Sequence, residues 1–283
     1  MQRVLKVAYA LVPMLREPIY RRILWEAANE EGLRARAFGV IHRAEWSDVK
    51  QHFSKQTVYV LGSGSSINNM RPQQIDRVRR GTSIGINWWP VYHKHISTFY
   101  MVESTECAIW DSLEHVVHHP QFVGILSSQY LARGKSSHQV KCLPHNLRNV
   151  TFSYVSSPVV GFYPKAYGVN VVQVLEAANW FTGVVAGPRR TSVERAIVMA
   201  AAGGASRIVL CGVDLQGAYF WEQRQHDEAH STSAGESFRR SAAARILHLA
   251  AILQERTHVR IFLAEDTGRL SGKLPVFSWR EGQ

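Results

Sequence analysis

From Thr57 onward, short apolar runs alternate with segments of helical periodicity, and this alternation leaves few folds open to the chain. The strand candidates are Val58–Leu61, Ser83–Asn87, Thr98–Val102, Phe122–Leu126, Arg207–Gly212 and His258–Leu263. The helix candidates are Pro72–Arg79, Glu106–His118, Val169–Asn179, Ser192–Ala202 and Gly235–Glu255. Strands that are apolar throughout are buried on both faces, as in parallel sheets. We therefore expect an α/β fold, with a Rossmann-like, doubly wound and mainly parallel sheet.

In sheets of this kind, ligands bind beyond the carboxyl ends of the strands. Three polar turns fall there, namely Ser63–Ser66, Asn87-Trp88 and Asp214–Tyr219. Residues 215–235 are rich in Gln, His, Glu and Ser and show no strong period, so we expect a lid there. The expected organisation is a basic helical arm over residues 1–50 and a Rossmann-like domain over residues 51–283.

The chain of 283 residues carries 33 Lys and Arg against 22 Asp and Glu, a net charge of +11. This charge favours an acidic partner, such as a polyanionic substrate, an anionic membrane surface or nucleic acid. Nucleic acid is disfavoured, because the sequence has neither zinc-finger spacing nor an RNP-like aromatic strand. A basic, solvated surface without a partner is the alternative interpretation.

The first 31 residues read as basic, partly amphipathic helices, and Leu33–His42 reads as an edge strand. No apolar run approaches the roughly 18–20 residues needed to span a bilayer. Two interpretations of the helices stay open: contact with an anionic membrane surface, or packing on the main domain. The expected location is cytoplasmic, peripheral to the inner face of the membrane in the first case. Three widely spaced cysteines, Cys107, Cys142 and Cys211, indicate reduced structural thiols.

The turn Gly62-Ser63-Gly64-Ser65-Ser66 follows the first strand of the alternating region. It has two glycines of the dinucleotide-binding fingerprint, but Ile67 stands where the third belongs, and no acidic residue follows at the spacing required for ribose. NAD and FAD are therefore disfavoured, and the P-loop pattern is missing. Two interpretations remain, a turn that contacts a ribose or phosphate and a turn in which glycine serves geometry alone.

Arg189-Arg190-Thr191-Ser192 precedes a helix, and Thr191 with Glu194 fits a capping box. Capping explains Thr191 and Glu194. It does not explain two arginines at the positive end of a helix dipole, which are unfavourable there unless an anion lies nearby. This segment therefore indicates an anionic ligand.

His226 and His230 have H-x₃-H spacing, but no third metal ligand is evident. A histidine has an ordinary pKa near 6.5 and is suited to take a proton from a sugar hydroxyl; a solvated loop histidine is the alternative. No Asp-x-Asp pair is present, so the ligand pair of common metal-dependent nucleotide-sugar transferases is missing. Glu103 and Asp214 stand at strand ends, where an aspartate also forms turns.

In their order and spacing, these segments resemble the bacterial lipooligosaccharide sialyltransferases of glycosyltransferase family 42. The resemblance covers about residues 57–278. It is carried by the Gly62–Ser66 turn, the strand ending in Asn87, Arg189–Ser192, Ile208–Asp214, the His226 and His230 pair, and Ser271–Pro275. It implies a metal-independent, inverting transfer of a CMP-activated acidic keto sugar to a cell-surface glycan or glycolipid, with no cofactor beyond the CMP-sugar substrate.

The resemblance also implies residue roles. His230 matches the general base that deprotonates the acceptor hydroxyl. Ser63, Gly64, Ser65 and Ser66 match the phosphate and ribose turn, and Asn87 a second contact. Thr191 and Ser192 match a segment that contacts the carboxylate of the donor sugar.

The chain departs from the family at three places. Ser63 replaces an Asn, Met101–Glu103 stands where another Asn is expected, and Gln216 falls where a tyrosine stabilises the leaving phosphate, with Tyr219 close by as a substitute. The donor stays open between sialic acid and a related ulosonate such as Kdo. Two alternatives also stay open: an MptE-like pyrophosphokinase or flagellin-modification protein, and a non-catalytic polyanion-binding module.

Overall fold

The computed structural model describes residues 46–92, 96–101, 107–127, 153–154, 191–217, 219–220 and 233–280. Within these ranges, seven strands form one sheet in the order β5-β4-β3-β2-β1-β6-β7, and every neighbouring pair is parallel. The strands are β1 (Thr57–Leu61), β2 (Thr82–Ile86), β3 (Phe99–Met101), β4 (Gly124–Ser127), β5 (Ser153–Tyr154), β6 (Arg207–Cys211) and β7 (Arg260–Leu263). The chain therefore has a parallel α/β sheet, compatible with a Rossmann-like fold.

The strand order reverses beside β1. From β1 the chain moves outward through β2, β3 and β4 to β5, and then returns to place β6 on the other side of β1. Leu61 pairs with Cys211, so the turns after β1 and β6 leave the sheet side by side. A reversal of this kind opens a crevice at the carboxyl ends of the strands, the usual ligand position in open α/β sheets.

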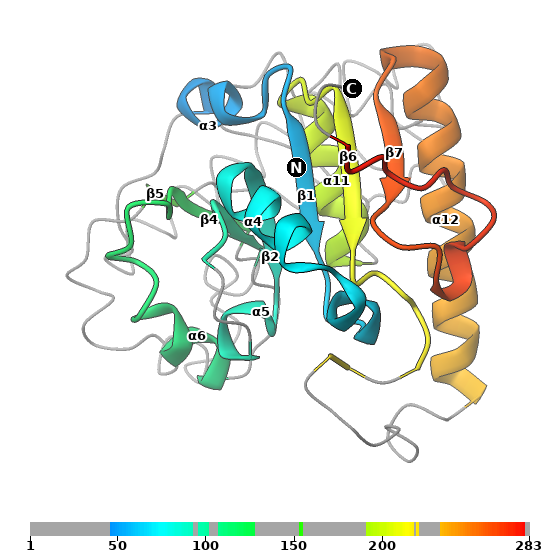
Figure 1. Ribbon diagram of the computed structural model, residues 1–283, viewed down its shortest axis with the longest axis horizontal. Coiled ribbons are helices and arrows are strands. Elements are labelled where there is room, and N and C mark those ends of the chain that lie inside the picture. Colours follow the sequence, from blue (N-terminus) through cyan, green and yellow to red (C-terminus); the bar gives the residue numbers. More distant parts are fainter. Residues whose placement is uncertain are drawn as a thin grey trace, which may run out of the picture.

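Helices cover both faces of the sheet (Figure 1). The helical elements are α3 (Trp46–Phe53), η2 (Ser65–Asn69), α4 (Pro72–Arg80), α5 (Trp89–Tyr92), α6 (Cys107–Leu113), α11 (Ser192–Ala202), α12 (Ser233–Thr257) and η4 (Gly268–Leu270). Helices α3, α11 and α12 supply buried residues to one face, and α4, α5 and α6 supply them to the other. In Figure 1, α11 lies behind β1 and β6 while α4 lies in front of the sheet.

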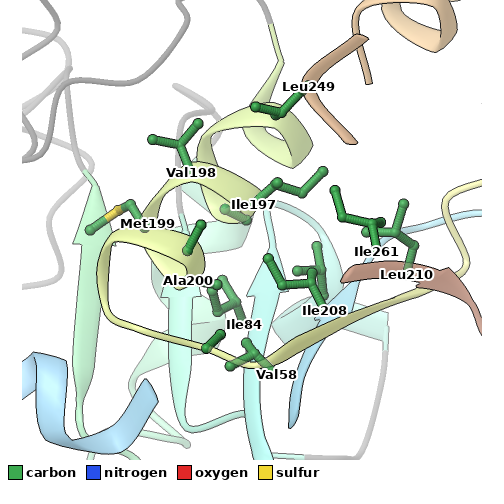
Figure 2. Packing of buried hydrophobic residues seen from close by; sticks show 14 of the residues in the cluster. Val58, Ile84, Ile197, Val198, Met199, Ala200, Ile208, Leu210, Leu249 and Ile261 are labelled. Carbon is green, nitrogen blue, oxygen red and sulfur yellow. The ribbon is translucent and has the colours of Figure 1, made fainter. Parts of the chain in front are cut away.

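Side chains alternate between the two faces along each strand. Val58 and Val60 of β1 pack with α11 residues such as Ile197, whereas Tyr59 and Leu61 belong to the cluster on the opposite face. Figure 2 shows Val58, Ile84, Ile208 and Leu210 of the sheet with Ile197, Met199 and Ala200 of α11. Burial on both faces explains why these strands read as continuous apolar runs in the sequence.

The structure confirms the six expected strands, with ends shifted by one or two residues. It adds the short β5 and α5, which the sequence did not predict. We expected a helix that extends to His118, but α6 ends at Leu113 and residues 114–118 form turns. Helix α11 matches its expected range, and α12 begins two residues before and ends two residues after its own.

Residues 1–45 of the expected arm, Leu33–His42 among them, lie outside the described residues, as does Val169–Asn179. Of the expected lid, residues 215–217, 219–220 and 233–235 are described. Helix α3 crosses the expected domain boundary at residue 50, and its Val49 and Phe53 are buried in the core of the sheet domain. Helix α12 begins at Ser233, inside the range expected for the lid. Among the described helices, none combines the length and apolar character needed to cross a membrane.

Candidate functional site at the carboxyl edge of the sheet

The turns that follow β1 and β6 are joined by backbone hydrogen bonds. The Gly62 N–H donates to the Cys211 carbonyl at 2.8 Å, and the Gly64 N–H donates to the Gly212 carbonyl at 2.7 Å. A Cβ atom on Gly64 would lie 2.5 Å from Oδ2 of Asp214. Glycine at position 64 is therefore required by this close approach of the two turns.

Asp214 joins the same two turns through its side chain. Its carboxylate is buried, with a relative exposure of 6% for the residue. Oδ2 accepts the Ser66 N–H at 2.9 Å, and Oδ1 accepts the Ser66 hydroxyl. These two hydrogen bonds connect positions that are 148 residues apart in the chain. Asp214 therefore fixes the conformation of the serine turn, and Ser66 has its donors committed to that carboxylate.

A returning segment crosses the serine turn and brings Tyr219 to it. Gly64 and Tyr219 form an isolated antiparallel bridge, and the Phe220 N–H donates to the Ser63 carbonyl at 3.0 Å. The Asn68 side-chain amide also donates to the Phe220 carbonyl at 2.8 Å. Tyr219 and the glycine-serine turn, both predicted for one site, are thus neighbours.

The hydroxyls of Ser63 and Ser65 differ from that of Ser66. Both residues are half-buried, and neither hydroxyl makes a hydrogen bond to another residue within the described ranges. A ribose hydroxyl or a phosphate oxygen is the kind of group that such donors bind. Of the three serines, Ser63 and Ser65 therefore have hydroxyls that are not bound to Asp214 and can donate to a ligand.

Asn87 connects the end of β2 to the first turn of α11. It adopts a left-handed backbone conformation with φ of +47°, and its N–H donates to the Met101 carbonyl at 3.0 Å. Its side-chain amide donates to the hydroxyl of Ser192 at 3.2 Å. Two residues predicted for the site thus meet at the amino end of a helix, where backbone N–H groups favour an anion.

Thr191 is the N-cap of α11, as the capping-box pattern predicted. Its hydroxyl accepts the Glu194 N–H at 3.1 Å and donates to Oε2 of Glu194 at 2.7 Å. Glu194, with 2% exposure, is also held by Arg245 of α12 through hydrogen bonds of 2.7 and 3.2 Å. Thr191 therefore caps the start of the helix, and Arg245 is a partner that no sequence pattern predicted.

We expect Glu194→Ala to lower the free energy of unfolding by about 3 kcal/mol, because it strands the Arg245 guanidinium and removes part of the cap. Urea denaturation at neutral pH measures the loss. Asp76→Ala is the matched control, since its carboxylate pairs with Arg79 at 3.3 Å at an exposed position and should matter far less. A loss of equal size in both variants would contradict a structural role for the buried pair.

Several predicted site residues fall outside the described residues, namely His226, His230, Arg189, Arg190 and Glu103. Gln216 is exposed after β6 and lines a pocket beside α12. Within the described ranges, no group of three His, Cys, Asp or Glu side chains is placed to hold a metal ion. The described part of the site therefore consists of the serine turn, Tyr219, the Asn87–Ser192 contact and Asp214.

Cys211 lies next to the site but is not exposed to it. The residue is fully buried, its thiol lies 3.9 Å from the Val209 carbonyl, and burial raises the pKa of that thiol. A thiol held in its neutral form is a weak nucleophile. Cys211 is therefore a packing residue of β6, in agreement with the structural role that the sequence indicated.

No protein-family model matches this chain, and no curated protein matches it either. The likeness to glycosyltransferase family 42 thus rests on the residues quoted above.

Proposed function

We propose that this protein is a metal-independent, inverting glycosyltransferase that binds a CMP-activated acidic keto sugar at the carboxyl edge of a Rossmann-like, doubly wound sheet. The observation that carries the proposal is the meeting of distant predicted residues at this edge. The serine turn, Asp214 and Tyr219 gather where the strand order reverses, and Asn87 contacts Ser192 at the end of the adjacent strand. The family resemblance supplies the chemistry.

In the proposed complex, the hydroxyls of Ser63 and Ser65 bind the ribose and phosphate of CMP, in a turn held by Asp214. The amino end of α11, preceded by Arg189 and Arg190, suits the carboxylate of the donor sugar, because backbone N–H groups and guanidinium groups both favour an anion there. Asn87 then serves as a second contact to the donor from the end of β2.

In the proposed reaction, His230 takes the proton of an acceptor hydroxyl, and the acceptor oxygen forms a bond to the anomeric carbon. The bond from that carbon to the CMP phosphate oxygen breaks, and CMP leaves with the electron pair. The phosphate is already a stable anion, so it needs hydrogen-bond donors rather than a strong acid. Tyr219, beside Gly64, is the candidate donor.

The first test is a thermal-shift series with CMP, UMP, ADP and GDP. We expect stabilisation by CMP alone; a ligand at 100 times its Kd adds about 2.7 kcal/mol, which corresponds to several degrees for a domain of this size. Ser63→Ala with Ser65→Ala should remove most of the CMP shift. Ser206→Ala, just before the amino end of β6, is the matched control and should keep it.

The same series separates the alternatives. Equal shifts with all four nucleotides, or none with CMP, would contradict the proposal. Stabilisation by adenine nucleotides that requires magnesium would instead favour the pyrophosphokinase. Binding to any polyanion, sensitive to salt and indifferent to CMP, would favour the polyanion-binding module.

A further inference from the structure

A pocket of about 500 Å³ lies between α12 and the segment that contains η4, next to the turn after β6. In Figure 1, the segment with η4 runs beside α12 at one side of the molecule. The volume of the pocket lies within the range of roughly 300–1,000 Å³ that is usual for small-molecule sites. The residues that line it are Gln216, Arg240, Ala243, Ala244, Leu247, Gly268, Arg269, Ser271 and Lys273.

One wall of this pocket is cationic and held in place by the backbone. The Nε of Arg269 donates to the Leu215 carbonyl at 2.9 Å, and the backbone N–H of Arg269 donates to the Asp214 carbonyl at 2.9 Å. The ammonium of Lys273 donates to the carbonyl of Arg269 at 3.1 Å. Arg240 adds a third positive group from α12. The wall is thus attached to the same turn that carries Asp214.

Within the described residues, the negative charge beside this wall is too small to balance it. Glu236 is shared by Arg239 at 3.6 Å, Arg240 at 3.0 Å and Arg269. Hydrogen bonds from Arg240 and Arg269 lower the pKa of Glu236, so this carboxylate is ionised at neutral pH. Even so, it is one negative group among three guanidinium groups and the Lys273 ammonium.

The other carboxylate of this loop, that of Asp266, is already engaged. It accepts the Ser271 hydroxyl at 2.8 Å and the Gly272 N–H at 2.9 Å. These two hydrogen bonds lower the pKa of Asp266, which keeps it ionised. The ammonium of Lys273 has no carboxylate within 4 Å in the part of the chain that the structure describes. Counted over the residues that the structure describes, the pocket therefore has an excess of positive charge.

The opposite wall is apolar, formed by Ala243, Ala244 and Leu247 of α12. We propose that this pocket binds a soluble phosphomonoester that carries a small apolar group. The phosphate dianion would lie against Arg240, Arg269 and Lys273, which offer forked and point-charge donors. The apolar group would lie along α12. The pocket shares Gln216 with the turn that follows β6, but binding of a phosphomonoester there does not depend on sugar transfer.

Hexyl phosphate is a suitable probe, with binding to the full-length chain measured by isothermal titration calorimetry. We expect saturable 1:1 binding, weakened by added salt, and competition by inorganic phosphate but not by hexanol. The double variant Arg240→Gln with Lys273→Gln should raise the Kd at least tenfold. Arg79→Gln with Lys55→Gln removes the same charge elsewhere and should leave the Kd unchanged; Arg79, like Arg240, has an ion pair within its own helix.

A second pair of variants tests the site without removing any cation. Ala244→Glu places a carboxylate in the pocket and should also raise the Kd at least tenfold, whereas Ala251→Glu, at an exposed position of α12 that does not line the pocket, should not. The proposal is overturned if hexyl phosphate does not bind, if hexanol competes as well as phosphate, or if pocket and control variants lose affinity equally. None of these measurements uses CMP, so they stand apart from the test of the transferase.

Discussion

Asp214→Ala is expected to lower the free energy of unfolding by about 3 kcal/mol and to abolish the stabilisation by CMP. The carboxylate receives both donors of Ser66 at a buried position. Hydrogen bonds to a charged group contribute about 1.5–3 kcal/mol each, and the buried Ser66 N–H would be left without a partner. Urea denaturation measures the first effect, and the thermal-shift series measures the second.

Two controls separate burial from hydrogen bonding alone. Asp266 accepts the same kinds of donor, a serine hydroxyl and a backbone N–H, but at an exposed position, so Asp266→Ala should cost much less stability. Asp214→Asn keeps the shape and one acceptor, and should fall between the wild type and Asp214→Ala. If Asp214→Ala unfolds at the wild-type urea concentration, the carboxylate does not hold the two turns together.

His230→Ala is expected to lower kcat for sugar transfer by about 10²–10⁴-fold, the usual contribution of a general base. This prediction rests on the family resemblance and on the proposed reaction, in which His230 accepts the acceptor proton. Because the base acts on the acceptor and not on the nucleotide, the CMP-induced thermal shift should be unchanged. In the wild type, kcat/KM should rise with pH as the imidazole loses its proton, because only the neutral imidazole can act as a base, and the variant should lack this rise.

His248→Ala is the control for this measurement, since His248 is an exposed histidine of α12. It should transfer sugar at the wild-type rate and keep the same pH profile. Unchanged turnover in His230→Ala would reject His230 as the base. A loss of CMP binding together with turnover would assign it to the donor site instead.

The sheet was predictable because each of its longer strands has a signal of its own. Val58–Leu61 and Ile208–Cys211 are apolar runs, and burial on both faces requires that pattern. Strand β5 has only two residues, Ser153 and Tyr154, too few to show a period. Helix α6 ends at Leu113, although the apolar residues Val116 and Val117 follow at helical spacing. These two residues pack against the core from turns, so their spacing alone did not reveal the end of the helix.

The site was predictable only in its parts. The sequence indicates that Ser66 and Asp214 follow strands, but which turns meet depends on the strand order, and no local pattern encodes that order. The sequence predicts that Asp214 stands at the end of a strand, but it does not predict that the carboxylate pairs with Ser66. The same holds for Glu194. Its capping contact with Thr191 is local and can be predicted from the sequence, whereas its ion pair with Arg245 joins residues 51 positions apart and cannot.

The place of β6 in the sheet has a consequence for synthesis on the ribosome. Strand β1 needs β6 as a neighbour, yet Arg207 is made long after Leu61. Because the ribosome adds roughly 5–20 residues per second, β6 is synthesised on the order of ten seconds after β1. Throughout that interval an apolar strand with unpaired backbone groups is exposed in the nascent chain, the kind of edge on which aggregation begins. Chaperone dependence during translation is thus an expected cost of this topology.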